Sequence, residues 1–189
     1  MKKIILAFLI AVAFIGCNSD STTDKNIEPK LVVDKQLDKL LLKDQFDKEH
    51  PINKDTYRLV FAFSKDAAHT CNDFFNTKGP NYLQEHHSQF IADVSAAPSL
   101  IRTLFILPGL KDFKHTVLLL DSKEQAAPFR KGMDVEKIAI VYIVNKRITK
   151  IKEITTQEEL RKALEDDSPM SFIAPMFNEA METTKEILK

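Results

Sequence analysis

The chain has 189 residues, of which 27 are basic and 27 are acidic, so its formal net charge is zero. A near-neutral chain without basic clusters gives no electrostatic reason to expect nucleic acid as a partner. The two cysteines, Cys17 and Cys71, are too few for a disulfide framework, and the length suits a single domain.

The N-terminus predicts export and lipid attachment. A basic start precedes twelve consecutive apolar residues, 4–15, which are too few to span a bilayer and typical of a signal-peptide core. The stretch ends in Phe14-Ile15-Gly16-Cys17, which resembles the lipobox of bacterial lipoproteins, although Phe14 replaces the usual leucine. The resemblance implies a signal peptide over residues 1–16 and lipidation of Cys17. An ordinary signal peptide with an incidental cysteine, or an uncleaved anchor, is the alternative.

Residues 17–36 are predicted to be the lipidated cysteine and a flexible tether. Residues 18–30 are polar, with Ile27 as the single large aliphatic residue, and such a composition buries too little surface to fold. We therefore expect a lipid-anchored protein of the bacterial cell envelope, held by its lipid at the membrane and facing the periplasm. Removal of residues 1–16 leaves 25 basic and 27 acidic residues, a net charge of −2. If Cys17 carries lipid, Cys71 is the one remaining thiol.

A folded domain is predicted over residues 37–166. It opens with a β-hairpin at 40–53, with Asp47-Lys48 at its turn, and an almost wholly apolar strand at 57–63. Helical spacing follows from about Ala67 to Thr77.

The remaining predicted elements alternate between strands and helices. They are a strand at 90–95, a helix capped by Ser99 and stopped by Pro108-Gly109, a strand at 115–121, a polar loop at 122–136, a β-hairpin at 138–154 around Asn145-Lys146, and a helix with a capping box of Thr155 and Glu158 that runs to about Glu165. Residues 167–189 predict an extra amphipathic C-terminal helix with an apolar stripe of Phe172, Ile173, Met176, Phe177, Ala180, Met181, Ile187 and Leu188.

This order predicts an α/β fold with a mixed central sheet flanked by helices. The hairpin LLLKDQFDKEHPIN followed by YRLVFAFSKD resembles the opening of thioredoxin-like proteins of the peroxiredoxin and membrane-anchored thioredoxin branch. FIADVSAAPSLIRTLF, HTVLLLD, the 138–154 hairpin and TTQEELRKALE resemble the later units of that fold. The resemblance covers roughly residues 37–166 and implies a thioredoxin-like domain.

The residues most diagnostic of thioredoxin chemistry are missing. The junction where thioredoxins carry Cys-x-x-Cys reads Ser64-Lys65-Asp66-Ala67-Ala68, and a dithiol mechanism needs two thiols close together. No proline precedes Cys71 in the pattern that peroxiredoxins use. The resemblance would also place a proline just before the third strand. The corresponding positions in this sequence are His115-Thr116, so this proline is absent as well.

Cys71 and two histidines, His69 and His115, are the candidate site residues. Cys71 is expected near a helix start with His69 two residues away, and both features lower the pKa of a thiol and favour a reactive thiolate. Residues i and i+2 do not share a helix face, however, which argues against the pair. The alternative is that Cys71 packs as a small hydrophobe with Phe74 and Phe75. The resemblance to copper-delivering thioredoxin-like proteins implies a metal set of His69, Cys71 and His115, whereas His86-His87 indicates a solvated helix end.

The sequence therefore favours a redox-inactive, membrane-anchored domain that serves as a binding or scaffold module for an envelope protein, with no cofactor. One alternative is a monothiol peroxidase or other thiol-redox enzyme that uses Cys71 and His69. The other is a periplasmic copper or zinc chaperone. The C-terminal apolar stripe is expected to pack on the domain, and docking of a partner protein is its alternative.

Overall fold

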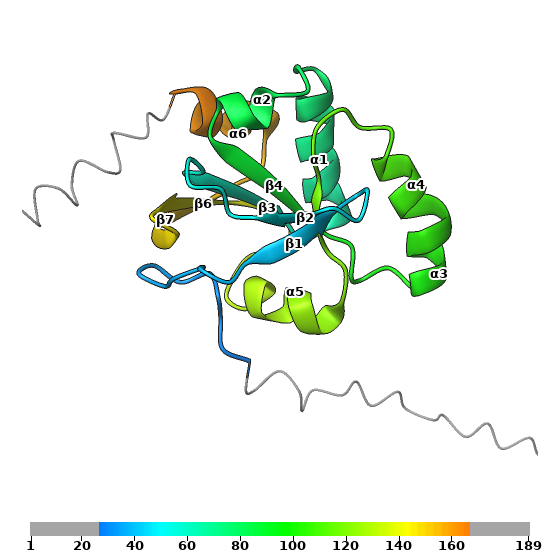
Figure 1. The fold of residues 1–189 in the computed structure, drawn as a ribbon, viewed down its shortest axis with the longest axis horizontal. Helices are drawn as coiled ribbons and strands as arrows, with labels where there is room; N and C mark the ends of the chain where they lie inside the picture. Colours follow the sequence, from blue (N-terminus) through cyan, green and yellow to red (C-terminus); the bar gives the residue numbers. More distant parts are fainter. Residues whose placement is uncertain (1–26, 167–189) are drawn as a thin grey trace, which may run out of the picture.

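The computed structural model describes residues 27–166, which fold around one seven-stranded mixed sheet with helices on both faces (Figure 1). The predicted α/β class is therefore confirmed. The strand order is β2-β1-β5-β4-β3-β6-β7. The strands are β1 (Leu41–Asp44), β2 (Glu49–Pro51), β3 (Arg58–Ala62), β4 (Ser88–Asp93), β5 (Leu118–Leu120), β6 (Ile138–Val144) and β7 (Arg147–Ile154). The helices are α1 (Lys65–Asn76), α2 (Tyr82–Glu85), α3 (Ser99–Ile101), α4 (Leu107–Leu110), α5 (Lys123–Arg130) and α6 (Gln157–Arg161), with π-helical turns η2 (Arg102–Ile106) and η3 (Lys162–Asp166).

The centre of the sheet has the predicted thioredoxin-like topology. Strand β3 leads into α1 and returns as the parallel neighbour β4, while β6 pairs with the other edge of β3 in the antiparallel sense and continues into β7 and α6. All five residues of β3 are buried, because helices cover both of its faces. The N-terminal hairpin β1–β2 joins through β5, which runs parallel to β4 and antiparallel to β1.

This topology corrects one sequence-based expectation. The third strand of the thioredoxin-like core is the one that pairs antiparallel with β3, and in this sheet that strand is β6. The residues to compare with the family's proline are therefore Val135-Glu136-Lys137 and not His115-Thr116. Neither position contains proline, and no peptide bond within residues 27–166 is cis.

Side chains alternate between two cores along each central strand. Val60, Phe90 and Ile140 lie under α1 and α6, while Leu59, Phe61 and Ile91 lie on the opposite face with α5. Both cores consist of side chains that are almost fully buried.

Three local predictions were wrong. The predicted loop at 122–136 contains helix α5, which the Ser122 side chain caps by accepting the Gln125 N–H. The capping box lies one residue later than predicted, with Thr156 and Glu159 as its partners. The cap of α3 is Pro98 and not Ser99, and it makes no side-chain hydrogen bond to the helix.

The helix that begins at α3 also continues past the expected stop at Pro108. Proline lacks an N–H and clashes with the carbonyl four residues earlier, so an undistorted α-helix does not fit. The turn η2 widens just before it, where the Leu107 N–H bonds to the Arg102 carbonyl five residues back. Helix α4 then runs through Pro108 and Gly109 to Leu110.

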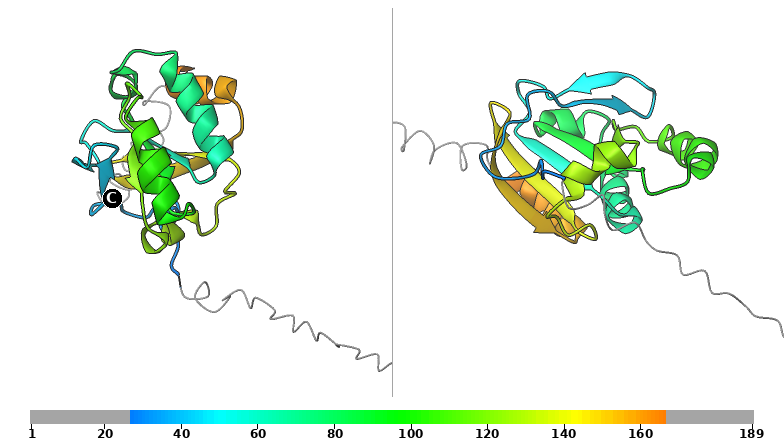
Figure 2. Two further views of the ribbon diagram at one scale, coloured as in Figure 1. Left: turned by 90° about the vertical axis from the view of Figure 1, so that its right-hand side faces the viewer. Right: turned by 90° about the horizontal axis from the view of Figure 1, so that it is seen from below.

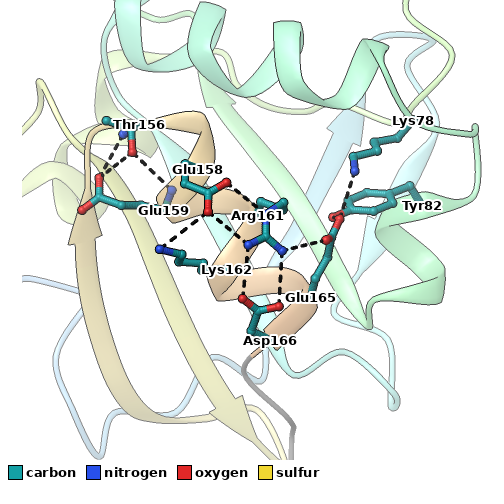
Figure 3. Close-up of polar contacts among 9 residues, drawn as sticks. All are labelled: Lys78, Tyr82, Thr156, Glu158, Glu159, Arg161, Lys162, Glu165 and Asp166. Carbon is teal, nitrogen blue, oxygen red and sulfur yellow. Dashed lines mark hydrogen bonds and ion pairs between the residues drawn. The ribbon is translucent and has the colours of Figure 1, made fainter.

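A polar network fastens the end of the described domain to the helices beside it (Figure 3). Glu165 accepts hydrogen bonds from Lys78, at 3.0 Å, and from the hydroxyl of Tyr82, at 2.9 Å. Arg161 contacts the same carboxylate at 3.1 Å. The hydrogen bonds from Lys78 and Tyr82 lower the pKa of Glu165 to about 2, so this carboxylate stays charged at neutral pH.

The folded part begins earlier in the chain than Leu37, which is the first residue of the domain predicted from the sequence. Leu31 is 2% exposed, the Lys30 N–H donates to the Pro128 carbonyl, and Gln36 pairs with Arg147 beside β7. Residues 30–36 thus lie against the domain. Within residues 27–166, no helix has both the length and the apolar character needed to cross a bilayer. The predicted signal peptide, Cys17 and the C-terminal helix lie outside the described residues.

Candidate functional site

The junction between β3 and α1 is the first place where the fold would support thiol chemistry. Ser64 has extended backbone geometry and caps α1, because its hydroxyl accepts the Ala67 N–H at 3.3 Å. Lys65 and Asp66 follow as exposed residues, and Ala67 is buried. The helix therefore starts two residues earlier than predicted, and its first turn holds no thiol.

Cys71 lies in the second turn of α1 and faces the core. It is 0% exposed and shares one cluster with Phe74 and Phe75, which is the packing that the sequence favoured. Burial raises the pKa of the Cys71 thiol far above its ordinary value, since a thiolate there would lose its hydration. A nucleophilic thiolate needs the opposite environment, an exposed and electropositive one. The geometry therefore does not support Cys71 as a catalytic residue.

His69 and His115 lie in different environments, and neither forms a reactive pair with Cys71. His69 is exposed. His115 is 3% exposed, stacks on Phe113 with ring centroids 5.2 Å apart, and places Nε2 3.0 Å from Asn72 Oδ1. Burial lowers the pKa of His115 to about 4, so its ring is neutral at pH 7.

The metal set expected from the sequence is not assembled in the described part of the chain. No group of three or more histidine, cysteine or acidic side chains within residues 27–166 is placed to hold a metal ion. His115 directs Nε2 at Asn72, and the side chain of Cys71 is enclosed by the core.

A cavity of about 710 Å³ opens beside this junction, at the carboxyl ends of β3 and β4. Its walls come from the start of α1, the end of β4, the residues before β6 and one side of the helix formed by α3, η2 and α4, which is called the α3–α4 helix below. Apolar lining residues include Phe63, Ala92, Val94, Ile106, Leu110 and Phe113. The carboxyl edge of an α/β sheet is where such folds bind ligands, because adjacent connections diverge there. In Figures 1 and 2 this edge is the side on which α3 and α4 project from the domain.

Polar groups converge on the cavity from three elements. His69 and Asn72 contribute from α1, and Asp93 and Arg130 line it from the ends of β4 and α5. The Asp93 side chain is 0% exposed, and its Oδ2 lies 3.2 Å from Arg130 Nε. Asp93 Oδ1 accepts the Ser95 N–H at 2.8 Å. This pair gives the cavity a charged group at the ends of β4 and α5, where Arg130 is 28% exposed, and Lys65 and Glu136 are the other charged residues that line the cavity.

Most residues of this site carried no recognisable signal in the sequence. Asp93 lies inside the strand predicted at 90–95, and Arg130 lies in the stretch at 122–136 that was interpreted as a polar loop. Asn72 gave no signal of its own. The available clue was a polar residue near the carboxyl end of each buried strand, Ser64 two residues after β3 and Asp93 as the last residue of β4, because the carboxyl ends of parallel strands meet at one edge.

No protein-family model and no curated protein matches the chain. Among solved structures, it is similar to an exposed lipoprotein thioredoxin from Streptococcus pneumoniae, at 11% identity and a TM-score of 0.47, over 68% of this chain and 98% of that one. It is also similar to the thioredoxin domain of a thiol-disulfide oxidoreductase from Bacteroides vulgatus, at 11% identity and a TM-score of 0.45, over 71% and 99% of the two chains. A SCO1/SenC family lipoprotein from Bacillus anthracis matches at 9% identity and a TM-score of 0.44, over 71% and 98%. The thioredoxin-like fold is established by the strand order, and these likenesses do not extend to chemistry.

Proposed function

We propose that this protein is an exported lipoprotein, attached to the cell envelope through Cys17, whose thioredoxin-like domain binds a partner without thiol chemistry. The observation that carries the proposal is the burial of Cys71 at 0% exposure beside a helix start that holds no thiol. The fold keeps its binding edge, and the group that would perform disulfide exchange is absent from that edge.

The cavity supports binding in place of catalysis. Its volume of about 710 Å³ lies in the range of known ligand sites, which combine apolar walls with a few convergent polar groups. The walls fit an apolar side chain or a short apolar segment of an envelope protein. Asp93 and Arg130 supply hydrogen-bonding groups at one end, as a segment with a polar flank would require.

Thiol reactivity tests the first half of this proposal. We expect the folded chain from residue 18 onward, which lacks Cys17, to react with an aromatic disulfide reagent only when urea unfolds it. We also expect it to consume no more peroxide and reduce no more insulin than its Cys71→Ala variant does. Rapid labelling of Cys71 in the folded protein, or activity that Cys71→Ala abolishes, would refute the redox-inactive assignment.

Gly109 is a cavity-lining position at which a side chain can be added without a clash. It lines the cavity, and a Cβ added there meets no heavy atom within 4 Å. Gly109→Leu should therefore narrow the cavity while improving helix propensity. Gly79→Leu is the matched control, because Gly79 has equally open surroundings and does not line the cavity.

The probe is anilinonaphthalene sulfonate, an apolar aromatic anion that fluoresces in dry sites. We expect saturable binding that Gly109→Leu weakens at least about tenfold and Gly79→Leu leaves unchanged; a tenfold change corresponds to about 1.4 kcal/mol. Equal binding by all three proteins would reject the cavity as the site.

Membrane attachment is tested separately at the N-terminus. Cys17→Ser should abolish lipid labelling of the protein and cleavage of its signal peptide. If that variant is still processed and membrane-bound, the protein is not exported as a lipoprotein.

A further inference from the structure

The helix that runs from Ser99 to Leu110 is apolar on two opposite sides. Ile106 and Leu107 pack against the core beneath α1, and Leu110 is 8% exposed. On the other side, Leu100, Leu104 and Phe105 are 66%, 56% and 67% exposed, and Ile101 is 43% exposed. A helix that is apolar all round is normally covered all round, so the second side indicates a binding surface.

The size of this patch limits what can cover it. At about 150–200 Å² per large apolar side chain, the exposed fractions of these four residues amount to roughly 400 Å². That is about half of the area, roughly 800 Å², that each partner buries in a standard protein interface. A second copy of the chain or another protein would therefore need additional surface, whereas a lipid surface requires no matched area.

Charge around the patch favours an anionic surface. Residues 94–111 contain no aspartate or glutamate, and their charged residues are Arg102 and Lys111. Lys114 follows shortly afterwards and is exposed, with Asp112 as the acidic residue between them. Eighteen residues without an acidic side chain are notable in a chain where 27 of 189 are acidic.

We propose that this surface, formed by Leu100, Ile101, Leu104 and Phe105, docks on a lipid bilayer that contains anionic head groups. Large apolar side chains enter the boundary between head groups and acyl chains, and nearby cations add electrostatic attraction. Docking would hold the domain in one orientation, with the cavity edge toward the membrane. The proposal extends the membrane attachment of the proposed function, but the surface can be tested without the lipid.

The absence of tryptophan from the chain makes a direct test available. Phe105→Trp places a single reporter in the surface, at a side chain that is 67% exposed, so the fold should tolerate it. Val33→Trp is the matched control, because Val33 is 48% exposed but belongs to the segment that pairs beside β7, away from α3. Both variants are prepared as the mature chain from residue 18 onward, without lipid, and mixed with vesicles of phosphatidylcholine alone or with added phosphatidylglycerol.

We expect the tryptophan emission of Phe105→Trp to move to shorter wavelength and to resist acrylamide quenching when vesicles containing phosphatidylglycerol are added. The tryptophan of Val33→Trp should remain quenchable. Lys111→Gln in the Phe105→Trp background should weaken partitioning into anionic vesicles about fivefold, the effect of one cation near a charged surface, and leave neutral vesicles unaffected.

Three results would overturn the proposal. If the tryptophan emission of Phe105→Trp neither shifts nor resists quenching with either kind of vesicle, the surface does not dock on lipid. A shorter-wavelength emission without vesicles that grows with protein concentration would assign the surface to a second copy. The same emission at every concentration would assign it to the chain's own residues outside 27–166. If the lipid-free chain docks on vesicles but Cys17 carries no lipid in cells, the proposed lipid attachment is wrong and the proposed docking surface is still supported.

Discussion

Replacing His115 should make the stability of the domain less sensitive to acid. The ring is buried against Phe113 and Phe75, with centroids 5.2 Å away in each case, and its Nε2 meets Asn72. His115→Phe keeps an aromatic ring in this space and removes the group that takes up a proton. It also leaves Asn72 without its partner, which costs about 1 kcal/mol at every pH.

The magnitude follows from the pKa of His115, which burial lowers from 6.5 to about 4 in the folded state. As the pH falls below 6.5, the unfolded chain binds a proton that the folded chain does not, so the free energy of unfolding decreases until the pH reaches about 4. With about 1.36 kcal/mol per pKa unit, the wild type should lose about 2 kcal/mol between pH 7 and pH 5 through this residue. His115→Phe should therefore be about 1 kcal/mol less stable than the wild type at pH 7 and about 1 kcal/mol more stable at pH 5.

Urea unfolding at pH 7, 6 and 5, followed by far-ultraviolet circular dichroism, measures this crossing. Parallel curves for the wild type and His115→Phe across this range would refute the assignment of His115 as a buried neutral histidine.

Three further pairs of substitutions can be measured in the same assay. Cys71→Ser should cost about 2 kcal/mol because it buries a hydroxyl without a partner, and Cys71→Ala about 1 kcal/mol; a neutral Cys71→Ser would mean that position 71 is not enclosed. Thr156→Ala should cost about 1 kcal/mol and Thr155→Ala less, and the reverse order would restore the capping box predicted from sequence. Arg130→Met should cost about 2 kcal/mol because it strands the buried Asp93 carboxylate, and Asp93→Asn should cost less; equal, negligible effects would show that the pair is solvated.

The element types along the chain were largely predictable because each depends on a local pattern. The continuous apolar runs of β3 and β4 and the Asn145-Lys146 turn between β6 and β7 have the expected form. Both residues of that turn have positive φ, as two-residue hairpin turns require. Helix α5 escaped prediction because its eight residues carry few apolar side chains and contain Pro128.

The candidate site was only partly predictable. The missing dithiol follows directly from the cysteine count, and the spacing of Cys71, Phe74 and Phe75 correctly favoured a buried cysteine. The Asp93–Arg130 pair joins residues from two elements that no local pattern connects. The position compared with the family's proline was misplaced for a similar reason, since it depends on which strand pairs with β3, but neither position contains proline.

The sequence by itself determined that this domain has one thiol, where its central strands lie, and which side of α1 is apolar. These properties depend on residue type and on spacing within a few turns. Tertiary structure decided that β5 lies between β1 and β4, that His115 meets Asn72, and that the carboxyl ends of β3 and β4 enclose a cavity. It also left one side of the α3–α4 helix uncovered within the described residues. The physical reason is that strand order and side-chain pairing arise from contacts between distant segments, which a periodic pattern in one segment does not specify.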